Sequence, residues 1–161
     1  MSKIFIFTAG NPEARSHLES SIIHPADKNI VLSSFPSDQQ DILNRIYEEE
    51  GGFYAWGAIP GAKNIVTWKN LDAGDWVLCV YKNEYRFVSK AKQTFDNYEC
   101  AKNIWGLDGT GKTWQLMYFL TKPIQPINGS VPAEKLNEYL HTSYMGFTQI
   151  SSERLNRISE D

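Results

Sequence analysis

The sequence has few of the residues from which catalytic and metal sites are built. It contains 3 histidines and 2 cysteines, and no histidine stands with carboxylates or cysteines at metal-ligand spacing. Cys79 and Cys100 are too far apart for a CxxC redox or zinc pair, and we expect both to be buried free thiols. We expect His17 and His24 to be surface or capping residues. Since no nucleophile elbow is present either, the sequence favours binding over catalysis, with no metal and no cofactor.

Positive charge and long apolar runs are also scarce. Lys and Arg total 16 against 19 Asp and Glu, for a net charge of -3 and a pI of about 5.6, which excludes a strongly basic nucleic-acid module. The longest apolar run, Trp76 to Tyr81, is far shorter than the roughly 20 residues of a membrane span. The N-terminus has no signal-peptide cleavage site. With 42% hydrophobic residues and a mean hydropathy of -0.41, we expect residues 1–161 to form one globular cytoplasmic domain, alone or as the N-terminal part of a longer protein.

Aromatic residues, in contrast, are abundant. They make up 13% of the chain, with 5 Trp and 8 Tyr, which is more than a core of this size needs. Trp76 lies inside the apolar run and is expected in the core. Glycines flank three other tryptophan segments, and a glycine there permits close approach of the backbone to a flat ligand. Core packing is the alternative for each of these rings, which are Trp56, Trp105 and Trp114.

Local patterns predict strands in the middle of the chain and helices toward both ends. Strands are expected at residues 3–8, 53–56, 64–68, 75–81, 85–92 and 114–120. Helices are expected at residues 12–23, after a capping box at 36–40 and ending at 51–52, at 130–140 and at 151–158. Because helices do not alternate with strands, this order favours an α+β fold, a small twisted β-barrel flanked by helices, over a parallel sheet.

Residues 106–113 match the GxxxxGK[ST] pattern of phosphate-binding loops in full. Such a loop follows a strand and opens a helix, so that backbone amides converge on the phosphates. Here residues 114–120 have the pattern of a strand, and the apolar run that should end in a magnesium-binding acid ends in Lys82. We interpret Asp108 to Lys112 as a glycine-rich hairpin turn, with a nucleotide-binding protein that uses Gly106 to Thr113 as the alternative.

A series of motifs runs through the chain in a characteristic order. It comprises the strand and turn at residues 5–11, Ala55-Trp56-Gly57 with Asn64 downstream, and strand-like segments at 74–78, 85–91 and 114–120. This order resembles the EVE and YTH domains of the PUA-like superfamily over about residues 3–158. It is most similar to the EVE-like N-terminal domains of McrB-type, modification-dependent restriction systems. The resemblance implies a small twisted β-barrel with flanking helices that binds nucleic acid and holds one modified base in an aromatic cage.

The resemblance also implies the residues of the base site. Trp56 and Tyr118 match the cage walls, with Gly57 beside the first. The turn after the first strand offers polar groups to the base edge, and a downstream amide is a further candidate; these residues are Ala9, Gly10, Asn11 and Asn64. The third wall is expected from residues 126–131 or 144–147. The chain has tyrosine where the YTH branch has a second tryptophan, and glycine where it has serine, so N6-methyladenine and methylated cytosine both stay open.

Cations gather on one predicted strand. Arg86, Lys90 and Lys92 share one face of residues 85–92 and are the expected phosphate contacts; a solvated basic face of an edge strand is the alternative. Lys112 and Lys122 can add to them. The sequence thus predicts a base-flipping reader of modified DNA with no chemistry of its own and no membrane association. It would target a restriction system whose nuclease or NTPase lies in another domain or subunit. A PUA-like RNA binder is the other alternative.

Overall fold

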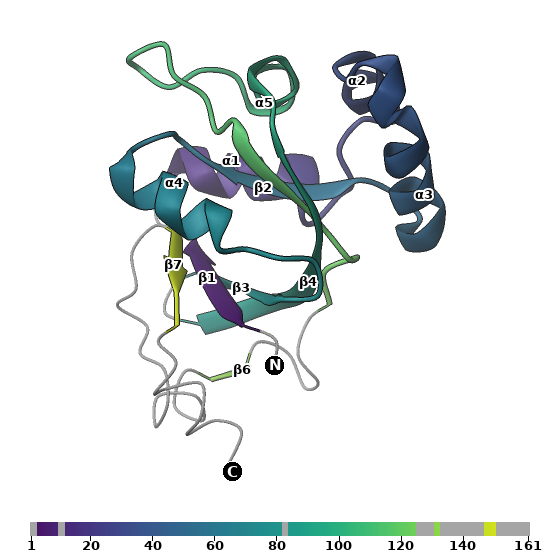
Figure 1. Ribbon diagram of the computed structural model, residues 1–161. Coiled ribbons are helices and arrows are strands. Elements are labelled where there is room, and N and C mark those ends of the chain that lie inside the picture. Colours follow the sequence, from purple (N-terminus) through teal and green to yellow (C-terminus); the bar gives the residue numbers. More distant parts are fainter. Residues whose placement is uncertain (1–2, 10–11, 82–83, 125–130, 133–146, 151–161) are drawn as a thin grey trace.

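The computed structural model describes residues 3–9, 12–81, 84–124, 131–132 and 147–150 (Figure 1). In chain order the elements are β1 (Ile4–Thr8), α1 (Pro12–Ser21), α2 (Lys28–Ser33), a 3-10 turn (Ser37–Gln39), α3 (Gln40–Glu50), β2 (Tyr54–Ala58), α4 (Ala62–Lys69), β3 (Trp76–Tyr81), β4 (Glu84–Asp96), α5 (Tyr98–Trp105), β5 (Leu116–Leu120), β6 (Val131–Pro132) and β7 (Phe147–Gln149). The strands form one sheet in the order β2-β5-β4-β3-β1-β7, and β6 pairs with β4. The expected α+β class is confirmed.

The sheet contains one parallel pair among antiparallel ladders. β1 and β3 are parallel, whereas the other ladders between neighbouring strands are antiparallel. A parallel pair requires a crossover connection. In this chain the crossover carries α1 to α4 and also β2, which joins the opposite end of the sheet.

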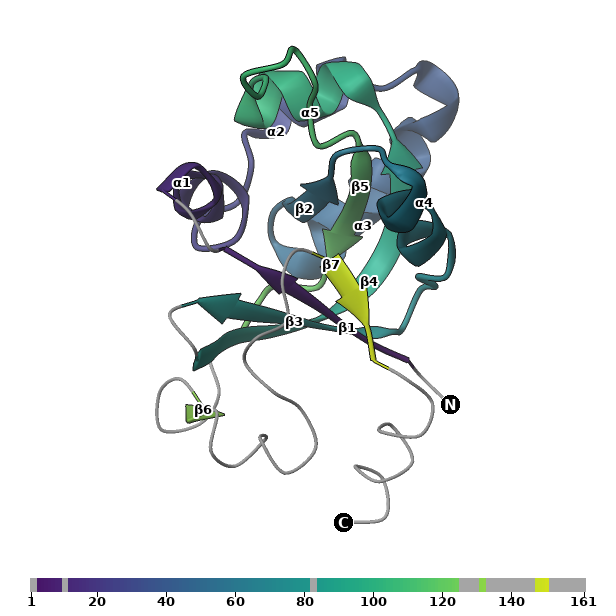
Figure 2. The same cartoon turned by 90° about the vertical axis from the view of Figure 1, so that its left-hand side faces the viewer.

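The long strand β4 bends the sheet. It pairs with β3 and with β5, and each ladder contains a register shift, between Cys79 and Val80 and between Ala91 and Gln93. Bulges of this kind bend a strand and increase its twist. As a result β2 and β5 lie over β1 and β3 (Figure 2), and Phe7, Trp56 and Tyr118 share one core.

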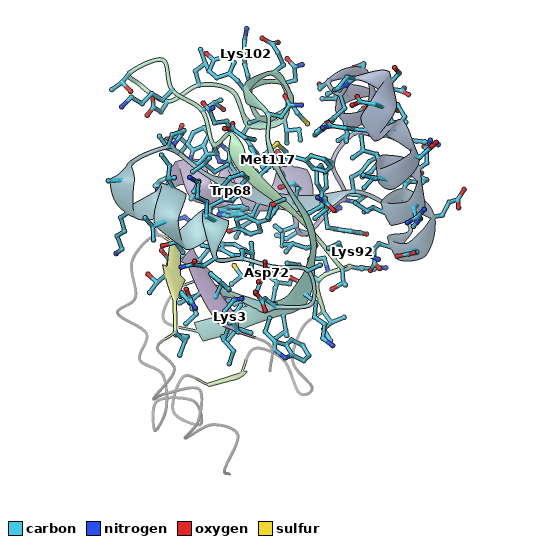
Figure 3. All side chains as sticks on the ribbon, in the orientation of Figure 1. Lys3, Trp68, Asp72, Lys92, Lys102 and Met117 are labelled. Carbon is cyan, nitrogen blue, oxygen red and sulfur yellow. The ribbon has the colours of Figure 1, made fainter. Side chains whose placement is uncertain are left out.

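In the described part of the chain the sheet is not closed into a barrel. β2 and β7 stand at the two ends of the strand order. Helix α4 packs against β7, and the indole N–H of Trp68 donates to the carbonyl of Met117 in β5 at 2.9 Å (Figure 3). The expected barrel is therefore not confirmed: within the described residues no ladder joins β2 to β7, and α4 packs against β7 and bonds to β5 instead.

A second core lies on the other face of β5. Leu116, Tyr118 and Leu120 point into the first core, whereas Met117 and Phe119 point into the second, with residues of α2, α3 and α5. Both faces of β5 are covered, which explains why its sequence is apolar without alternation. None of the helices in the described ranges is both long enough and apolar enough to cross a membrane.

Several local expectations hold, and two expected elements differ in type. The predicted helix at residues 12–23 is α1, and the helix expected after residues 36–40 is α3, which ends at Gly51 with φ +71°. The capping box expected at 36–40 is not formed, because a 3-10 turn occupies Ser37–Gln39 and no side chain caps this turn or α3. Residues 64–68, expected as a strand, lie in α4. Their β-branched side chains favour a strand, but the Trp68 anchor to β5 favours the helix. Residues 131–132, expected near the start of the helix at 130–140, instead form β6, which pairs with β4. The rest of that helix and the helix expected at 151–158 lie outside the described residues.

Two helices were not expected, although each has a recognisable N-cap. The Asp27 carboxylate accepts from the backbone N–H groups of Asn29 and Ile30 at the start of α2. The Asn97 side chain accepts from the N–H of Cys100 at the start of α5. Side-chain caps of this type are the signal that identifies both helices.

Trp76 is also placed differently from the expectation. It is 39% exposed, and the ammonium of Lys90 lies 4.5 Å from its ring centroid. Within β3 the neighbouring Val77 and Cys79 point into the core. An apolar run in a strand buries alternate residues, so Trp76 falls on the outer face.

Candidate functional site

Four aromatic rings meet where α1, β2 and the segment from α5 to β5 come together. The ring centroid of His17 lies 4.4 Å from that of Trp114, 6.0 Å from Trp105 and 6.3 Å from Trp56. His17, Trp56 and Trp105 are buried, whereas Trp114 is half-buried. We call these four residues the tryptophan cluster. It unites the three glycine-flanked tryptophans that the sequence singled out separately.

A chain of hydrogen bonds ties the cluster to the sheet. The indole N–H of Trp105 donates to the hydroxyl of Ser21 at 3.1 Å, and this hydroxyl donates to the carbonyl of Ala55 at 2.6 Å. Ser21 is fully buried, so each of these polar groups needs its partner. The bonds fix α1 and α5 to β2 and hold the rings in position.

Gly57 permits the close approach that the sequence suggested, but to the protein's own backbone. A Cβ atom at Gly57 would lie 2.2 Å from the carbonyl oxygen of Trp114 and 3.1 Å from Cζ3 of Trp105. Any larger residue would displace the segment that carries Trp114. Glycine at this position is thus a requirement of the tryptophan cluster.

His17 was expected at the surface or in a cap, and this expectation is wrong. The side chain is buried on the inner face of α1, one helical turn before Ser21. Burial lowers the pKa of His17, while the charge of Glu13 and a hydrogen bond with the backbone of Trp105 act in the opposite direction. The spacing of His17, Leu18 and Ser21 along one helix face is the signal that identifies it.

Trp56 and Tyr118 lie opposite each other in the ladder between β2 and β5. Trp56 stacks on Phe7 with ring centroids 4.7 Å apart, and Tyr118 stacks on Phe147 at 5.0 Å. Phe147 belongs to the segment 144–147 from which a third wall was expected; residues 126–130 and 144–146 lie outside the described part. One face of each proposed cage ring is therefore covered by a phenylalanine.

The hydroxyl of Tyr118 is a buried polar group with no hydrogen-bond partner in the described part of the chain. The side chain is 0% exposed, and its oxygen has no hydrogen bond within the described residues. Burial raises the pKa of Tyr118 well above its usual value, and the nearby Cys79 acts in the same direction. The phenol is thus a neutral group inside the first core.

The other expected base contacts are engaged within the protein or not described. The N–H of Ala9 donates to the carbonyl of Val80 at 3.0 Å. The side-chain amide of Asn64 donates to the carbonyl of Ile59 at 2.9 Å, which closes the loop between β2 and α4. Gly10 and Asn11 lie outside the described residues.

The three cations of β4 differ in their surroundings. Lys92, labelled in Figure 3, is bound by the carboxylates of Glu49 and Glu50, and its ammonium lowers the pKa of Glu49. Lys90 lies over Trp76, as described above. Arg86 is half-buried beside the first register shift, and Lys92 lies at the second. The two bulges interrupt the strict alternation on which a single basic face depends.

The segment from Gly106 to Thr113 is a turn between a helix and a strand. α5 precedes it and β5 follows, which is the reverse of a phosphate-binding loop. The carboxylate of Asp108 accepts from the N–H groups of Thr110 and Lys112 at 2.8 and 2.9 Å. The backbone donors are therefore satisfied by a negative charge of the protein itself. The expected turn is confirmed, although it does not join two strands of a hairpin.

No protein-family model matches the sequence, and no similar protein was found among curated sequences. Solved structures match at low sequence identity. One is the N-terminal domain of Thermococcus gammatolerans McrB bound to m5C DNA, with a TM-score of 0.67 and 14% identity over 99% of this chain and 96% of that chain. Another is human THYN1 in complex with 5-methylcytosine containing DNA, with a TM-score of 0.50 and 10% identity over 99% and 96% of the two chains. The chain has the fold of these two proteins.

The resemblance to EVE-like and McrB-type domains is thereby confirmed for the general α+β fold, although the closed barrel that it implies is not. A YTH domain, that of Zygosaccharomyces rouxii MRB1 in complex with N6-methyladenosine RNA, also matches, at 12% identity over 99% of this chain and 83% of that chain. Its TM-score is 0.35.

Proposed function

We propose that this protein is a nucleic-acid reader that binds one modified base flipped out of a DNA duplex. The observation that carries the proposal is the fold shared with the McrB N-terminal domain, which was solved bound to m5C DNA. Human THYN1, with the same fold, was solved with 5-methylcytosine DNA. We therefore propose methylated cytosine rather than N6-methyladenine as the preferred base.

The proposed site is the tryptophan cluster together with the end of β1. Trp56 and Tyr118 are the cage walls that the resemblance implies, and Trp114 is an added candidate. Trp114 is half-buried and is the outermost ring of the cluster, so a base can reach it with less rearrangement. Tyr118 is fully buried, so a base reaches it only if Phe147 or a neighbouring ring moves.

The free energy that the site must supply by stacking is set by the free-energy cost of flipping the base. Extruding a base from a duplex costs a few kcal/mol, and each aromatic stack returns about 1 to 3 kcal/mol. Burial of one methyl group adds only about 0.8 kcal/mol. Hydrogen bonds at the base edge are therefore needed to select cytosine over the other bases. They are the same for cytosine and 5-methylcytosine, so the preference for the methylated base rests on how closely the site packs on the methyl group. Gly10 and Asn11 are candidates, and the side-chain oxygen of Asn64 suits the exocyclic amino group of cytosine.

The proposal is tested by fluorescence anisotropy with duplexes that carry one 5-methylcytosine or none. We expect tighter binding to the methylated duplex, and about a tenfold loss for Trp114→Ala, as the removal of one stack predicts. Trp56→Phe should also weaken binding while keeping the core filled. Trp76→Ala is the matched control, since this exposed tryptophan lies outside the cluster. Equal binding to both duplexes, or full affinity of Trp114→Ala, would refute the proposal.

We further propose that residues 1–161 act as one targeting domain of a restriction system and perform no chemistry. The similarity of the fold to the N-terminal domain of McrB supports this role. A nuclease or NTPase would then lie in another domain or subunit. We expect the chain alone to hydrolyse neither ATP nor DNA, and turnover of either by the purified protein would contradict the proposal.

Two other functions remain to be separated by experiment. A nucleotide-binding protein that uses Gly106 to Thr113 is disfavoured by the Asp108 carboxylate at the centre of the turn. Lys112→Ala would abolish ATP binding in that case, whereas we expect no ATP binding to begin with. An RNA reader is distinguished by competition between RNA and DNA strands of the same sequence. We expect DNA to compete more strongly.

A further inference from the structure

The turn between α5 and β5 projects directly from the tryptophan cluster. We call residues 106–113 the Asp108 loop. Trp105 precedes it and Trp114 follows it, and both rings contact His17. Figure 1 shows the loop beside α5, at the opposite end of the molecule from β6. A ligand bound at the tryptophan cluster would therefore contact this loop.

The loop is ordered by its own hydrogen bonds. Besides the two backbone donors described above, the hydroxyl of Thr110 donates to Asp108 at 2.8 Å. The N–H of Asp108 donates to the carbonyl of Lys112 at 2.7 Å, and the hydroxyl of Thr113 donates to the carbonyl of Gly106 at 2.8 Å. A segment ordered in this way loses little conformational entropy when it binds a partner.

Two glycines allow the chain to enter and leave this turn. Gly106 has φ +83° and Gly111 has φ +82°, values that favour glycine over residues with a Cβ atom. The hydrogen bonds that Asp108 accepts lower its pKa, so the carboxylate stays ionised. Its charge faces the loop's own N–H groups.

The loop presents one apolar side chain and basic neighbours to solvent. Leu107 is 43% exposed. Lys112 within the loop and Lys102 in α5 are exposed, and Figure 3 shows Lys102 extending away from α5. Another exposed aliphatic residue, Ile42, lies on α3, which contributes no residue to the cluster. Leu107 stands between two of its members in the sequence.

We propose that the Asp108 loop enters the DNA duplex, with Leu107 filling the gap that the flipped base leaves and with Lys102 and Lys112 contacting the flanking phosphates. Flipping leaves a hole in the base stack, and proteins that open base steps commonly insert an apolar side chain. A rigid loop with one exposed leucine beside an aromatic site provides an apolar side chain that can fill this hole. This inference rests on the proposed function.

The test compares Leu107→Ala with the matched control Ile42→Ala on 5-methylcytosine DNA. Each variant is titrated against the methylated duplex and against the same methylated strand alone. The duplex carries 2-aminopurine beside the modified base, whose fluorescence rises when the base step opens. An inserted side chain such as Leu107 is needed only when the base stack of a duplex must be opened. We therefore expect Leu107→Ala to lose roughly tenfold in duplex affinity, and most of the fluorescence rise, with unchanged single-strand binding.

Each other outcome has a definite meaning. Full duplex affinity of Leu107→Ala, or equal losses of affinity for the duplex and the single strand, would overturn the proposed insertion of Leu107. Loss of duplex binding by Ile42→Ala as well would also overturn it, because the effect would not be specific to the loop. If the unaltered protein binds neither form of methylated DNA, the proposed function itself fails.

The phosphate contacts are tested by salt dependence. Each phosphate contact contributes about one unit to the slope of log affinity against log salt. The loop uses only the backbone of Lys112, so Lys112→Gln should lower the slope by about one without altering the turn. Lys90→Gln examines the cations of β4 in the same assay, where we expect a smaller change. An unchanged slope for Lys112→Gln, or a decrease with Lys90→Gln alone, would refute the contact.

Discussion

Replacing Gly57 with alanine tests whether the contact between β2 and the segment before β5 holds the tryptophan cluster together. The added Cβ would lie 2.2 Å from the carbonyl oxygen of Trp114, where ordinary contact begins at 3.4 Å. The carbonyl would have to retreat by about 1.2 Å. Gly57 pairs with Met117 in the β2/β5 ladder, so neither side can move without straining that ladder.

The expected loss of stability follows from this obstacle. Overpacking a well-packed site costs about 1 to 3 kcal/mol, and a backbone carbonyl yields less readily than the end of a side chain. We therefore expect about 2 to 3 kcal/mol of lost unfolding free energy. In a domain of this size each kcal/mol lowers the melting temperature by about 2 to 4 °C, so a decrease of about 4 to 12 °C should be seen.

Urea unfolding followed by circular dichroism and tryptophan fluorescence measures the effect. Gly109→Ala is the matched control, because nothing lies within 4 Å of a Cβ at Gly109 and its backbone does not require glycine. We expect this control to match the unaltered protein or to be slightly more stable. A change below about 0.5 kcal/mol in Gly57→Ala, which is typical of surface substitutions, would refute the argument that Gly57 supports the cluster.

Three further predictions concern single side chains. Tyr118→Phe should raise the unfolding free energy by up to about 1 kcal/mol, because it removes a buried hydroxyl without a described partner; a clear loss in urea unfolding would show that the hydroxyl is bound. Trp76→Ala should cost about 1 to 2 kcal/mol in thermal unfolding, well below the roughly 3 to 5 kcal/mol of a buried ring, because Trp76 is 39% exposed; a loss in the higher range would contradict its place on the outer face. Burial lowers the pKa of His17 below 6.5, so the unfolded state takes up a proton first and stability should fall as the pH drops below about 6.5. Urea unfolding of the protein and of His17→Gln at about pH 7.5 and 5.5 checks this, and an equal decrease in both would refute it.

Local patterns predicted much of the fold correctly. The strand at residues 4–8, the helix that ends at Gly51 and the apolar strand β5 are all readable from neighbouring residues, because capping and propensity act over a few positions. The strand expected at residues 64–68 was wrong because a long-range contact outweighs the local pattern there. Its β-branched residues indicate a strand, but the contact of Trp68 with β5 joins positions that are distant in the sequence.

The candidate site was predicted in part. Trp56, Trp105 and Trp114 were singled out by their glycine neighbours, and Gly57 by its place beside Trp56. His17 was missed, because its partners are contributed by β2 and by the segment from α5 to β5. The basic face of β4 depended on strict alternation, which two bulges interrupt.

The sequence by itself determined which residues are available to the site and the class of fold: it has an excess of tryptophan, glycines beside the rings, and local patterns that favoured an α+β fold over a parallel sheet. The helices α4 and α5 between the strands were not part of that expectation. Only the tertiary structure decided which rings meet. The crossover between the parallel strands β1 and β3 carries α1 and β2 to the far side of the sheet, and the β2/β5 register sets Gly57 against Trp114. These contacts depend on chain topology and strand register, which act between residues far apart in the sequence and leave no local pattern.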